Sequence, residues 1–174
     1  RSPGRKLGDF PYAWASDDVF RTCGSIGRAG QVVLRTRWQV RCMKRVLFVC
    51  TGNSCRSQMA EAFAERLAAG RVDACSAGSR PAGSVNPRAV AFMAERGYDL
   101  TAQVSKPLSA FEGQTFDAVV TMGCGDACPW LPATRRVDWD LPDPKALPDN
   151  EFRAVRDEIE LSVQRLLDEV DKLS

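Results

Sequence analysis

Cys50 and Arg56 are the residues of this 174-residue chain whose types and spacing most clearly predict chemistry. Cys50 ends an apolar run, rich in β-branched residues, that is typical of a buried parallel strand, and a helical pattern begins at Ser57. In a loop of this kind, backbone N–H groups and the positive end of the helix dipole converge on one point. We therefore expect Cys50 to act as a nucleophilic thiolate and Arg56 to bind a tetrahedral oxyanion through two parallel N–H bonds. The alternative is a cysteine with a purely structural role in a core strand.

The segment from Cys50 through five further residues to Arg56-Ser57 resembles a known phosphate-binding loop. Low-molecular-weight protein tyrosine phosphatases and thioredoxin-coupled arsenate reductases share this loop. The resemblance implies that Ser57 hydrogen-bonds the Cys50 sulfur. It also implies that the oxyanion is bound by seven successive residues, which are Thr51, Gly52, Asn53, Ser54, Cys55, Arg56 and Ser57. Gln58, the next residue, fits the reductases better than the phosphatases.

Two further cysteines, Cys124 and Cys128, follow a predicted strand whose carboxyl end lies at the same sheet edge as Cys50. Gly123 and Gly125 flank Cys124 and would let the backbone move, so that the two thiols could close a disulfide. This segment resembles the redox-cysteine region of arsenate reductases, in which two electrons must come from thiols. Buried structural thiols are the alternative. A zinc half-site is disfavoured, because the chain has no histidine and no further cysteine pair to complete four ligands.

Asp143-Pro144 is the third motif that could take part in the chemistry, after the Cys50 loop and the pair Cys124 and Cys128. In the phosphatase superfamily, an Asp-Pro on this loop supplies the general acid, and proline pre-sets the loop that delivers the carboxyl group. The aromatic residues that often follow in tyrosine phosphatases are replaced here by Lys145 and Ala146. An ordinary aspartate in a proline turn is the alternative interpretation, and Asp140 is the fallback acid.

Three polar residues, Asn53, Glu61 and Ser76, match positions that form a buried network beneath the loop in this superfamily. In some reductases the same positions form a potassium site, which an aspartate often completes. The corresponding residue here is Lys106, whose ammonium could replace the cation. We therefore predict neither potassium nor another metal ion, and no bound cofactor.

The net formal charge of +2 hides an uneven distribution of charge. Residues 1–42 carry eight Lys or Arg and three Asp or Glu, whereas residues 43–174 carry 16 and 19. The basic surplus therefore belongs to residues 1–42, which lack sustained periodicity and which we predict to be a disordered, non-native or upstream leader. A basic targeting arm is the alternative. The remainder gives no support for nucleic-acid binding.

Seven cysteines at irregular spacing do not resemble a secreted disulfide framework. The chain also contains no signal-peptide pattern and no apolar run that approaches a membrane span. We therefore expect a cytoplasmic, monomeric protein with reduced thiols and no membrane association. Cys55 is predicted to be a small filler in the loop, and Cys75 a core residue.

The remaining pattern alternates strands and helices, which predicts an α/β fold with a four-stranded parallel sheet and helices on both faces. Residues 43–174 resemble the low-molecular-weight phosphatases over nearly their whole length, and the fold of that family is a four-stranded parallel sheet of this type. The predicted strands are Arg45–Cys50, Val72–Ser76, Phe116–Met122 and Arg136–Trp139. The predicted helices span Ser57–Ala69, a segment from the cap Asn86-Pro87 to Gly97, a short turn after Pro107, and a long final helix capped by Asp149 or Asn150.

These resemblances together imply an arsenate reductase. Cys50 would attack arsenic, Asp143 would protonate the departing hydroxyl, and Cys124 and then Cys128 would pass the disulfide outward. The final acceptor would be an external reductant: thioredoxin, a glutaredoxin-type protein or a low-molecular-weight thiol. Two alternatives remain. One is a protein tyrosine phosphatase that uses Cys50, Arg56 and Asp143, and the other is a non-enzymatic oxyanion or thiol-redox sensor.

Overall fold

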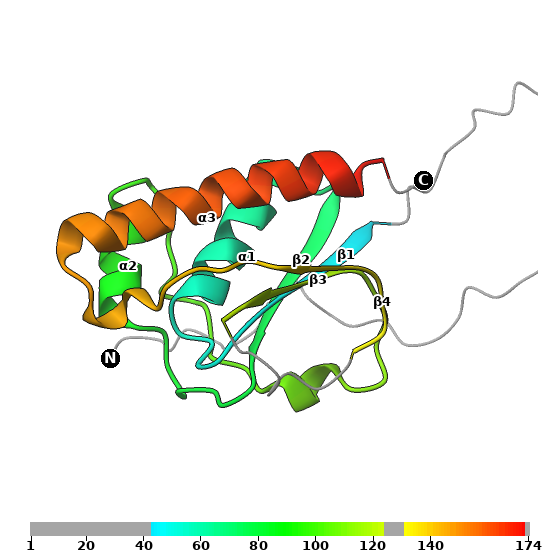
Figure 1. Cartoon of the computed structure of the whole chain (residues 1–174), viewed down its shortest axis with the longest axis horizontal. Coiled ribbons are helices and arrows are strands. Elements are labelled where there is room, and N and C mark those ends of the chain that lie inside the picture. Colours follow the sequence, from blue (N-terminus) through cyan, green and yellow to red (C-terminus); the bar gives the residue numbers. More distant parts are fainter. Residues whose placement is uncertain (1–42, 124–130, 173–174) are drawn as a thin grey trace, which may run out of the picture. The chain divides into compact units, whose positions relative to one another are not determined.

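The computed structural model describes residues 43–123 and 131–172, in which four parallel strands form one sheet (Figure 1). The strand order is β2-β1-β3-β4, and the strands span β1 Lys44–Cys50, β2 Val72–Gly78, β3 Phe116–Met122 and β4 Ala133–Asp138. The helices span α1 Arg56–Ala68, α2 Pro87–Ala94 and α3 Asp149–Val170, with short 3₁₀ turns at η1 Leu108–Phe111 and η3 Pro144–Ala146. The predicted fold class is confirmed.

The central strand β1 explains why its sequence is continuously apolar. It pairs with β2 on one side and β3 on the other, and residues 46–50 are buried on both faces. In this register Cys50 lies opposite Gly78 of β2 and Met122 of β3. The edge strand β4 instead alternates half-buried and exposed residues. Cys50 is therefore placed at the carboxyl edge of the sheet, where ligands of parallel sheets bind.

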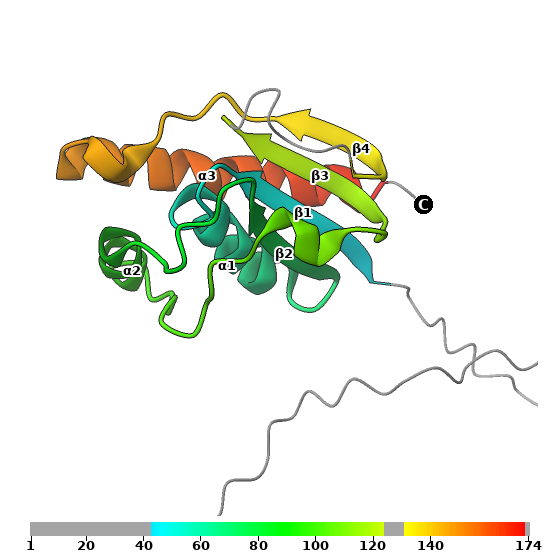
Figure 2. The same cartoon turned by 90° about the horizontal axis from the view of Figure 1, so that it is seen from below.

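Each face of the sheet has its own cover. Phe48 belongs to the face that packs against the apolar sides of α1 and α3, including Phe63 and Ile159, all three fully buried. Figure 2 shows these two helices on the same side of the sheet. Leu47 belongs to the opposite face, which is covered by η1 and by Leu131. Burying each large side chain contributes about 1.5–3 kcal/mol, so this packing fixes the sheet edge that carries Cys50.

The helix ends differ in part from the predicted ones. Asn86 caps α2 as expected, because its side chain accepts a hydrogen bond from the Arg88 N–H at 2.9 Å. The predicted cap of α3 by Asp149 or Asn150 is wrong: Pro148 precedes the helix, and Arg88 binds the Asp149 carboxylate at 2.8 Å. α2 also ends at Ala94, before the predicted stop, because Glu95 to Gly97 tighten into a turn. No helix within the described ranges has the length and apolar character needed to cross a membrane.

Candidate active site

The loop between β1 and α1 is held in place through its carbonyl groups. Four of these carbonyls accept backbone N–H groups from the segment that follows β2: Ser79 to Cys50 (3.2 Å), Arg80 to Thr51 (2.8 Å), Ala82 to Gly52 (2.9 Å) and Asn86 to Ser54 (2.9 Å). Because these carbonyl oxygens are engaged by a neighbouring segment, the loop can present its N–H groups to an anion. Backbone N–H groups so arranged at the start of a helix form a site for a tetrahedral oxyanion.

The Cys50 sulfur lies inside this loop and is 3% exposed. It accepts the backbone N–H of Asn53 at 3.2 Å and lies 3.0 Å from the Ser57 hydroxyl oxygen. The predicted contact between Ser57 and Cys50 is therefore present. The Asn53 N–H and the Ser57 hydroxyl thus both lie within hydrogen-bond distance of the sulfur.

Asn53 determines which way the hydrogen bonds around the sulfur run. Its side-chain oxygen accepts from the Gln58 amide at 2.9 Å and from the Lys106 backbone N–H at 2.6 Å, which fixes the orientation of the amide group. The amide nitrogen must then donate both protons, one to Ser57 at 2.9 Å and one to Ser76 at 2.8 Å. Since the Ser57 oxygen already accepts a proton, its own hydroxyl proton is free to point at Cys50. The network thus delivers one more donor to the sulfur.

Gly78 allows this loop to lie against β2. A β-carbon on Gly78 would come within 2.9 Å of the Asn53 backbone nitrogen, the Asn53 β-carbon and the Thr51 carbonyl oxygen. Such contacts are shorter than real side chains make, and backbone atoms cannot move aside easily. Asn53 itself adopts a left-handed backbone with φ of 42°, a conformation that asparagine tolerates better than most residues.

Arg56 is 5% exposed and is held from two directions. Its guanidinium donates to the Leu141 carbonyl at 2.8 Å and lies 3.5 Å from the Asp143 carboxylate. Gly123, at φ of 64°, passes so close that a β-carbon there would lie 2.9 Å from an Arg56 nitrogen. The structure thus brings Asp143, rather than the fallback Asp140, into contact with the arginine of the loop.

The Lys106 ammonium contacts the carboxylate beneath the loop. It lies 2.8 Å from Glu61 Oε1, while the other oxygen of Glu61 accepts the Ser76 hydroxyl. The predicted network of Asn53, Glu61 and Ser76 is present. We continue to expect no potassium ion at these residues, because the Lys106 ammonium already neutralises the Glu61 carboxylate.

Three cysteines of the described residues can be compared directly. Cys50 and Cys55 are buried, and Cys75 is half-buried and packs against the apolar face that includes Leu47. Burial raises the pKa of the Cys55 thiol to about 11, with the Asp143 carboxylate adding to the effect, and burial likewise raises the pKa of Cys75 to about 11. Both residues are therefore neutral thiols near pH 7. Cys124 and Cys128, and residues 1–42, which we predicted to be a leader, lie outside the described residues.

Arg88 is a residue that the sequence interpretation missed. From the first turn of α2 it donates to the carbonyls of Lys145 at 2.9 Å and Leu147 at 2.8 Å, in addition to its ion pair with Asp149. Its guanidinium also stacks over the Phe152 ring, 4.9 Å from the centroid. Arg88 thus ties the loop that carries Asp143 to the helix whose cap binds the anion loop. No local motif signals this role, because the contacts span about sixty residues of sequence.

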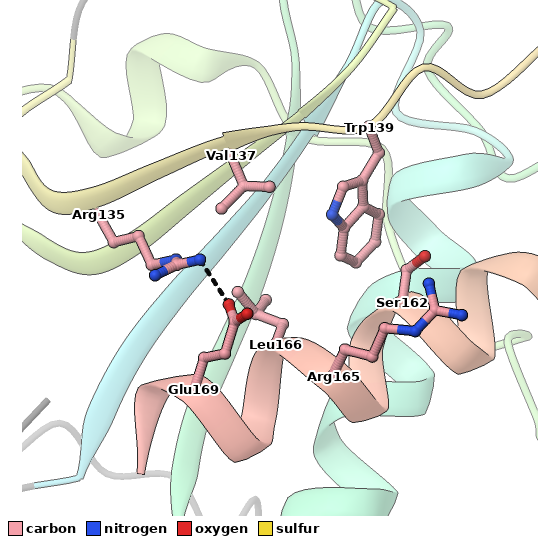
Figure 3. Close-up of a pocket in the computed structure, with 7 residues that line it drawn as sticks. All are labelled: Arg135, Val137, Trp139, Ser162, Arg165, Leu166 and Glu169. Carbon is pink, nitrogen blue, oxygen red and sulfur yellow. Dashed lines mark ion pairs between the residues drawn. The ribbon is translucent and has the colours of Figure 1, made fainter. Parts of the chain in front are cut away.

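A separate surface cavity of about 210 Å³ lies between β4 and α3 (Figure 3). Arg135 and Glu169 form an ion pair of 2.6 Å at one side, and the Trp139 indole points from the end of β4 toward α3. The full lining is Arg135, Val137, Trp139, Ser162, Arg165, Leu166 and Glu169. None of these belongs to the predicted site, so we assign the cavity no part in its chemistry.

The fold and the site define the class of the protein. A cysteine at the end of the first strand of a parallel sheet, an anion loop and a clamped arginine at the following helix are the parts of a cysteine-dependent phosphatase-like domain. A family model described as low molecular weight phosphotyrosine protein phosphatase matches residues 45–174. The chain belongs to this family.

Similar proteins share a narrower description. A glutaredoxin arsenate reductase of Synechocystis sp. is 41% identical over 128 residues, which cover 72% of this chain and 97% of the relative. A solved arsenate reductase in the phosphate binding state is 40% identical, with a TM-score of 0.68 and coverage of 74% of this chain and 99% of the other. A solved thioredoxin-dependent arsenate reductase from Corynebacterium glutamicum is 31% identical, with a TM-score of 0.64. The match covers 76% of this chain and 64% of the other. Within its family, the chain groups with arsenate reductases.

Replacing Ser57 by alanine should slow the reaction of Cys50 with iodoacetamide at pH 7.5 by about tenfold. The reason is that a hydrogen bond to a charged group contributes about 1.5–3 kcal/mol, and 1.4 kcal/mol is a factor of ten. Tandem mass spectrometry of the tryptic peptide 46–56 can assign the modification to Cys50 rather than Cys55, with neutral Cys55 and Cys75 as slow internal references. Ser162→Ala, on the surface of α3, is the matched control. An unchanged rate in Ser57→Ala would contradict the direction assigned to the Ser57 proton.

Replacing Lys106 by methionine should lower the thermal midpoint by roughly 3–6 °C, because it leaves the buried Glu61 carboxylate without its cation. We expect a cost of about 1–2 kcal/mol, reduced from that of a fully buried pair because Lys106 is partly exposed. KCl should restore part of the loss, more than NaCl at equal concentration. In Lys44→Met, which loses a surface pair with Asp117, the two salts should act alike. A wild-type midpoint that rises specifically with KCl would show that the site does take a cation.

Proposed function

We propose that this enzyme, an arsenate reductase, converts arsenate to arsenite by attack of the Cys50 thiolate on arsenic. The observation that carries the proposal is the Cys50 sulfur, which receives the Asn53 N–H at 3.2 Å and the Ser57 hydroxyl at 3.0 Å inside an anion loop. The similarity to arsenate reductases over 72% of the chain supports arsenate as the oxyanion. The class of enzyme is an oxidoreductase.

In the first step, Cys50 forms a bond to arsenic(V) and one arsenate oxygen leaves as water. Arg56 and the N–H groups of residues 51–57 stabilise the negative charge that develops on the remaining oxygens. Asp143 is the proposed general acid, because its carboxylate lies 3.5 Å from Arg56 and stays 46% exposed at the mouth of the loop.

In the second step, another thiolate attacks the Cys50 sulfur. A sulfur–sulfur bond forms, the sulfur–arsenic bond breaks, and its electron pair remains on arsenic, which leaves as arsenite. We propose Cys124 for this attack and Cys128 for the next, which transfers the disulfide to Cys124 and Cys128 and frees Cys50. Two thiols are then oxidised for each arsenic reduced.

The disulfide must be reduced by an external thiol system. Relatives of this chain are named both as a glutaredoxin arsenate reductase and as a thioredoxin-dependent one, and these names support a protein reductant of that general class. We further propose that residues 43–174 form the catalytic domain, because the family match and the whole sheet lie within this range. The leader would then have no part in the chemistry.

The proposed activity can be tested by arsenate-dependent consumption of NADPH with thioredoxin and thioredoxin reductase, and in parallel with glutathione, glutaredoxin and glutathione reductase. At least one system should support turnover with release of arsenite. Cys50→Ser should abolish it, because a hydroxyl group stays protonated in this loop. Cys75→Ser, a half-buried cysteine outside the loop, is the control and should retain activity.

Different outcomes would separate the alternatives. Release of phosphate from a phosphotyrosine peptide, without arsenite from arsenate, would assign the protein to the tyrosine phosphatases. Oxidation of the protein by one equivalent of arsenate without turnover in either system would favour a sensor.

The cysteine relay predicts that Cys124→Ser and Cys128→Ser stop at different stages. Without Cys128, the disulfide between Cys50 and Cys124 should accumulate after one turnover, because its exchange partner is missing. Without Cys124, arsenic should stay bound to Cys50 until an external thiol arrives. Tryptic mass spectrometry after a single addition of arsenate identifies each species. Normal turnover of Cys124→Ser with a protein reductant would overturn the relay and leave the loop chemistry in place.

A further inference from the structure

The Lys145 side chain lies against the anion loop. A β-carbon placed on Gly52 would be 3.1 Å from the Lys145 ammonium nitrogen, so the positive charge is close to the loop backbone. Lys145 directly follows the proposed general-acid pair Asp143-Pro144, and it lies far from Gly52 in the sequence. Two independent segments therefore meet at the lip of the loop, with a cation between them.

The Lys145 backbone is held firmly enough to place that charge. Arg88 donates to the Lys145 carbonyl at 2.9 Å, and the Lys145 N–H donates to the Asp143 carboxylate at 3.3 Å. Pro144, the residue between Asp143 and Lys145, has a φ angle fixed by its ring. The short 3₁₀ turn is therefore tethered at both ends, and the flexible part is the lysine side chain alone.

The charges around the ammonium leave it available to an anion. Asp143 faces both Arg56 and the turn, and its carboxylate is shared with the guanidinium at 3.5 Å. Among the residues that the structure describes, no carboxylate forms an ion pair with Lys145. The positive charge of Lys145 acts on the loop, because it opposes the rise in the pKa of the Cys55 thiol.

We propose that Lys145 is a further substrate-binding residue, which contributes a positive charge at the lip of the loop and favours small tetrahedral dianions such as arsenate and inorganic phosphate. Arg56 and the loop N–H groups bind the oxygens near Cys50, and the ammonium of Lys145 meets oxygens that face the solvent. This inference rests on the proposed function for arsenate as the substrate, but the binding of phosphate tests it independently.

The ammonium suits this role because it is mobile. A lysine carries a point charge on a flexible stem, so it can follow an oxygen as the anion enters and as the leaving oxygen departs. The arginine, in contrast, is fixed by the Leu141 carbonyl. At an exposed lip, we expect one such contact to strengthen binding of a dianion by about fivefold, well below the value for a buried charge pair.

The test compares the full chain with its Lys145→Gln and Lys172→Gln variants. Lys172 follows the end of α3, which is roughly 33 Å long at 1.5 Å per residue, so this control removes the same charge far from the loop. Titration calorimetry with inorganic phosphate gives Kd without any turnover. Lys145→Gln should weaken phosphate binding about fivefold and raise the KM for arsenate by a similar factor, and Lys172→Gln should change neither. At about 1 M NaCl, where charges are screened beyond roughly 3 Å, the difference should shrink to less than twofold.

Several results would overturn the inference. These are a phosphate Kd that Lys145→Gln leaves within twofold of wild type, an equal loss in Lys172→Gln, or a loss that persists in high salt. A fall in kcat with unchanged phosphate Kd would instead make Lys145 a positioning residue for Asp143. If wild type binds phosphate through Lys145 but reduces no arsenate, the proposed function fails and the role of Lys145 remains. If arsenate is reduced and phosphate binding ignores Lys145, only this inference fails.

Discussion

The direction of one side-chain amide underlies the whole site. Asn53 accepts through its oxygen from Gln58 and Lys106, so its nitrogen can only donate, and this forces the Ser57 hydroxyl proton toward Cys50. A reversed amide would put donors against donors and leave the sulfur without this hydrogen bond. The buried position of Asn53 raises the cost of any such mismatch, since unsatisfied groups there lose the full energy of desolvation. The amide is therefore held in one orientation by the donors that its oxygen accepts from Gln58 and Lys106.

The charge beneath the loop is part of the same arrangement. Glu61 accepts the Ser76 hydroxyl, which in turn accepts from Asn53, so the carboxylate completes the chain of donors that begins at the Lys106 backbone. Lys106 contributes twice, once through its N–H to Asn53 and once through its ammonium to Glu61. A covalently attached cation has the advantage that its entropy of localisation is already paid by folding, whereas a free ion must be taken from solution. The charge of the buried Glu61 carboxylate is therefore balanced by a side chain of the same chain.

Sequence reasoning succeeded where chemistry and structure are contiguous. The strand, the loop and the start of α1 lie within about twenty residues, so the alternation of apolar pattern, turn residues and helix was enough to place Cys50, Ser57 and Arg56. It was less accurate at the edge strand β4, because only one side of that strand pairs and its alternating residues give a weak signal. The sequence interpretation gave the wrong cap for α3 and missed the role of Arg88, and both failures have the same cause. The Asp149 carboxylate is bound by a guanidinium from α2, and such a contact follows from the packing of distant segments rather than from local preference.

The loop itself cannot distinguish a reductase from a phosphatase, because arsenate and phosphate present the same tetrahedral shape and charge to Arg56 and the N–H groups. The difference must arise after attack, since arsenic accepts an electron pair when its bond to sulfur breaks and phosphorus does not. That step needs a second sulfur in line with the first, yet Cys50 is only 3% exposed and sits at the base of the loop. The attacking thiol must therefore reach the Cys50 sulfur on the side opposite the sulfur–arsenic bond, which requires the loop to admit it. Cys55, although nearby in sequence, is a poor candidate because burial holds its pKa near 11 and keeps it protonated. The reaction thus requires a further thiol besides Cys50 and Cys55, and for this role we propose the cysteine pair that follows β3 in the sequence, Cys124 and Cys128.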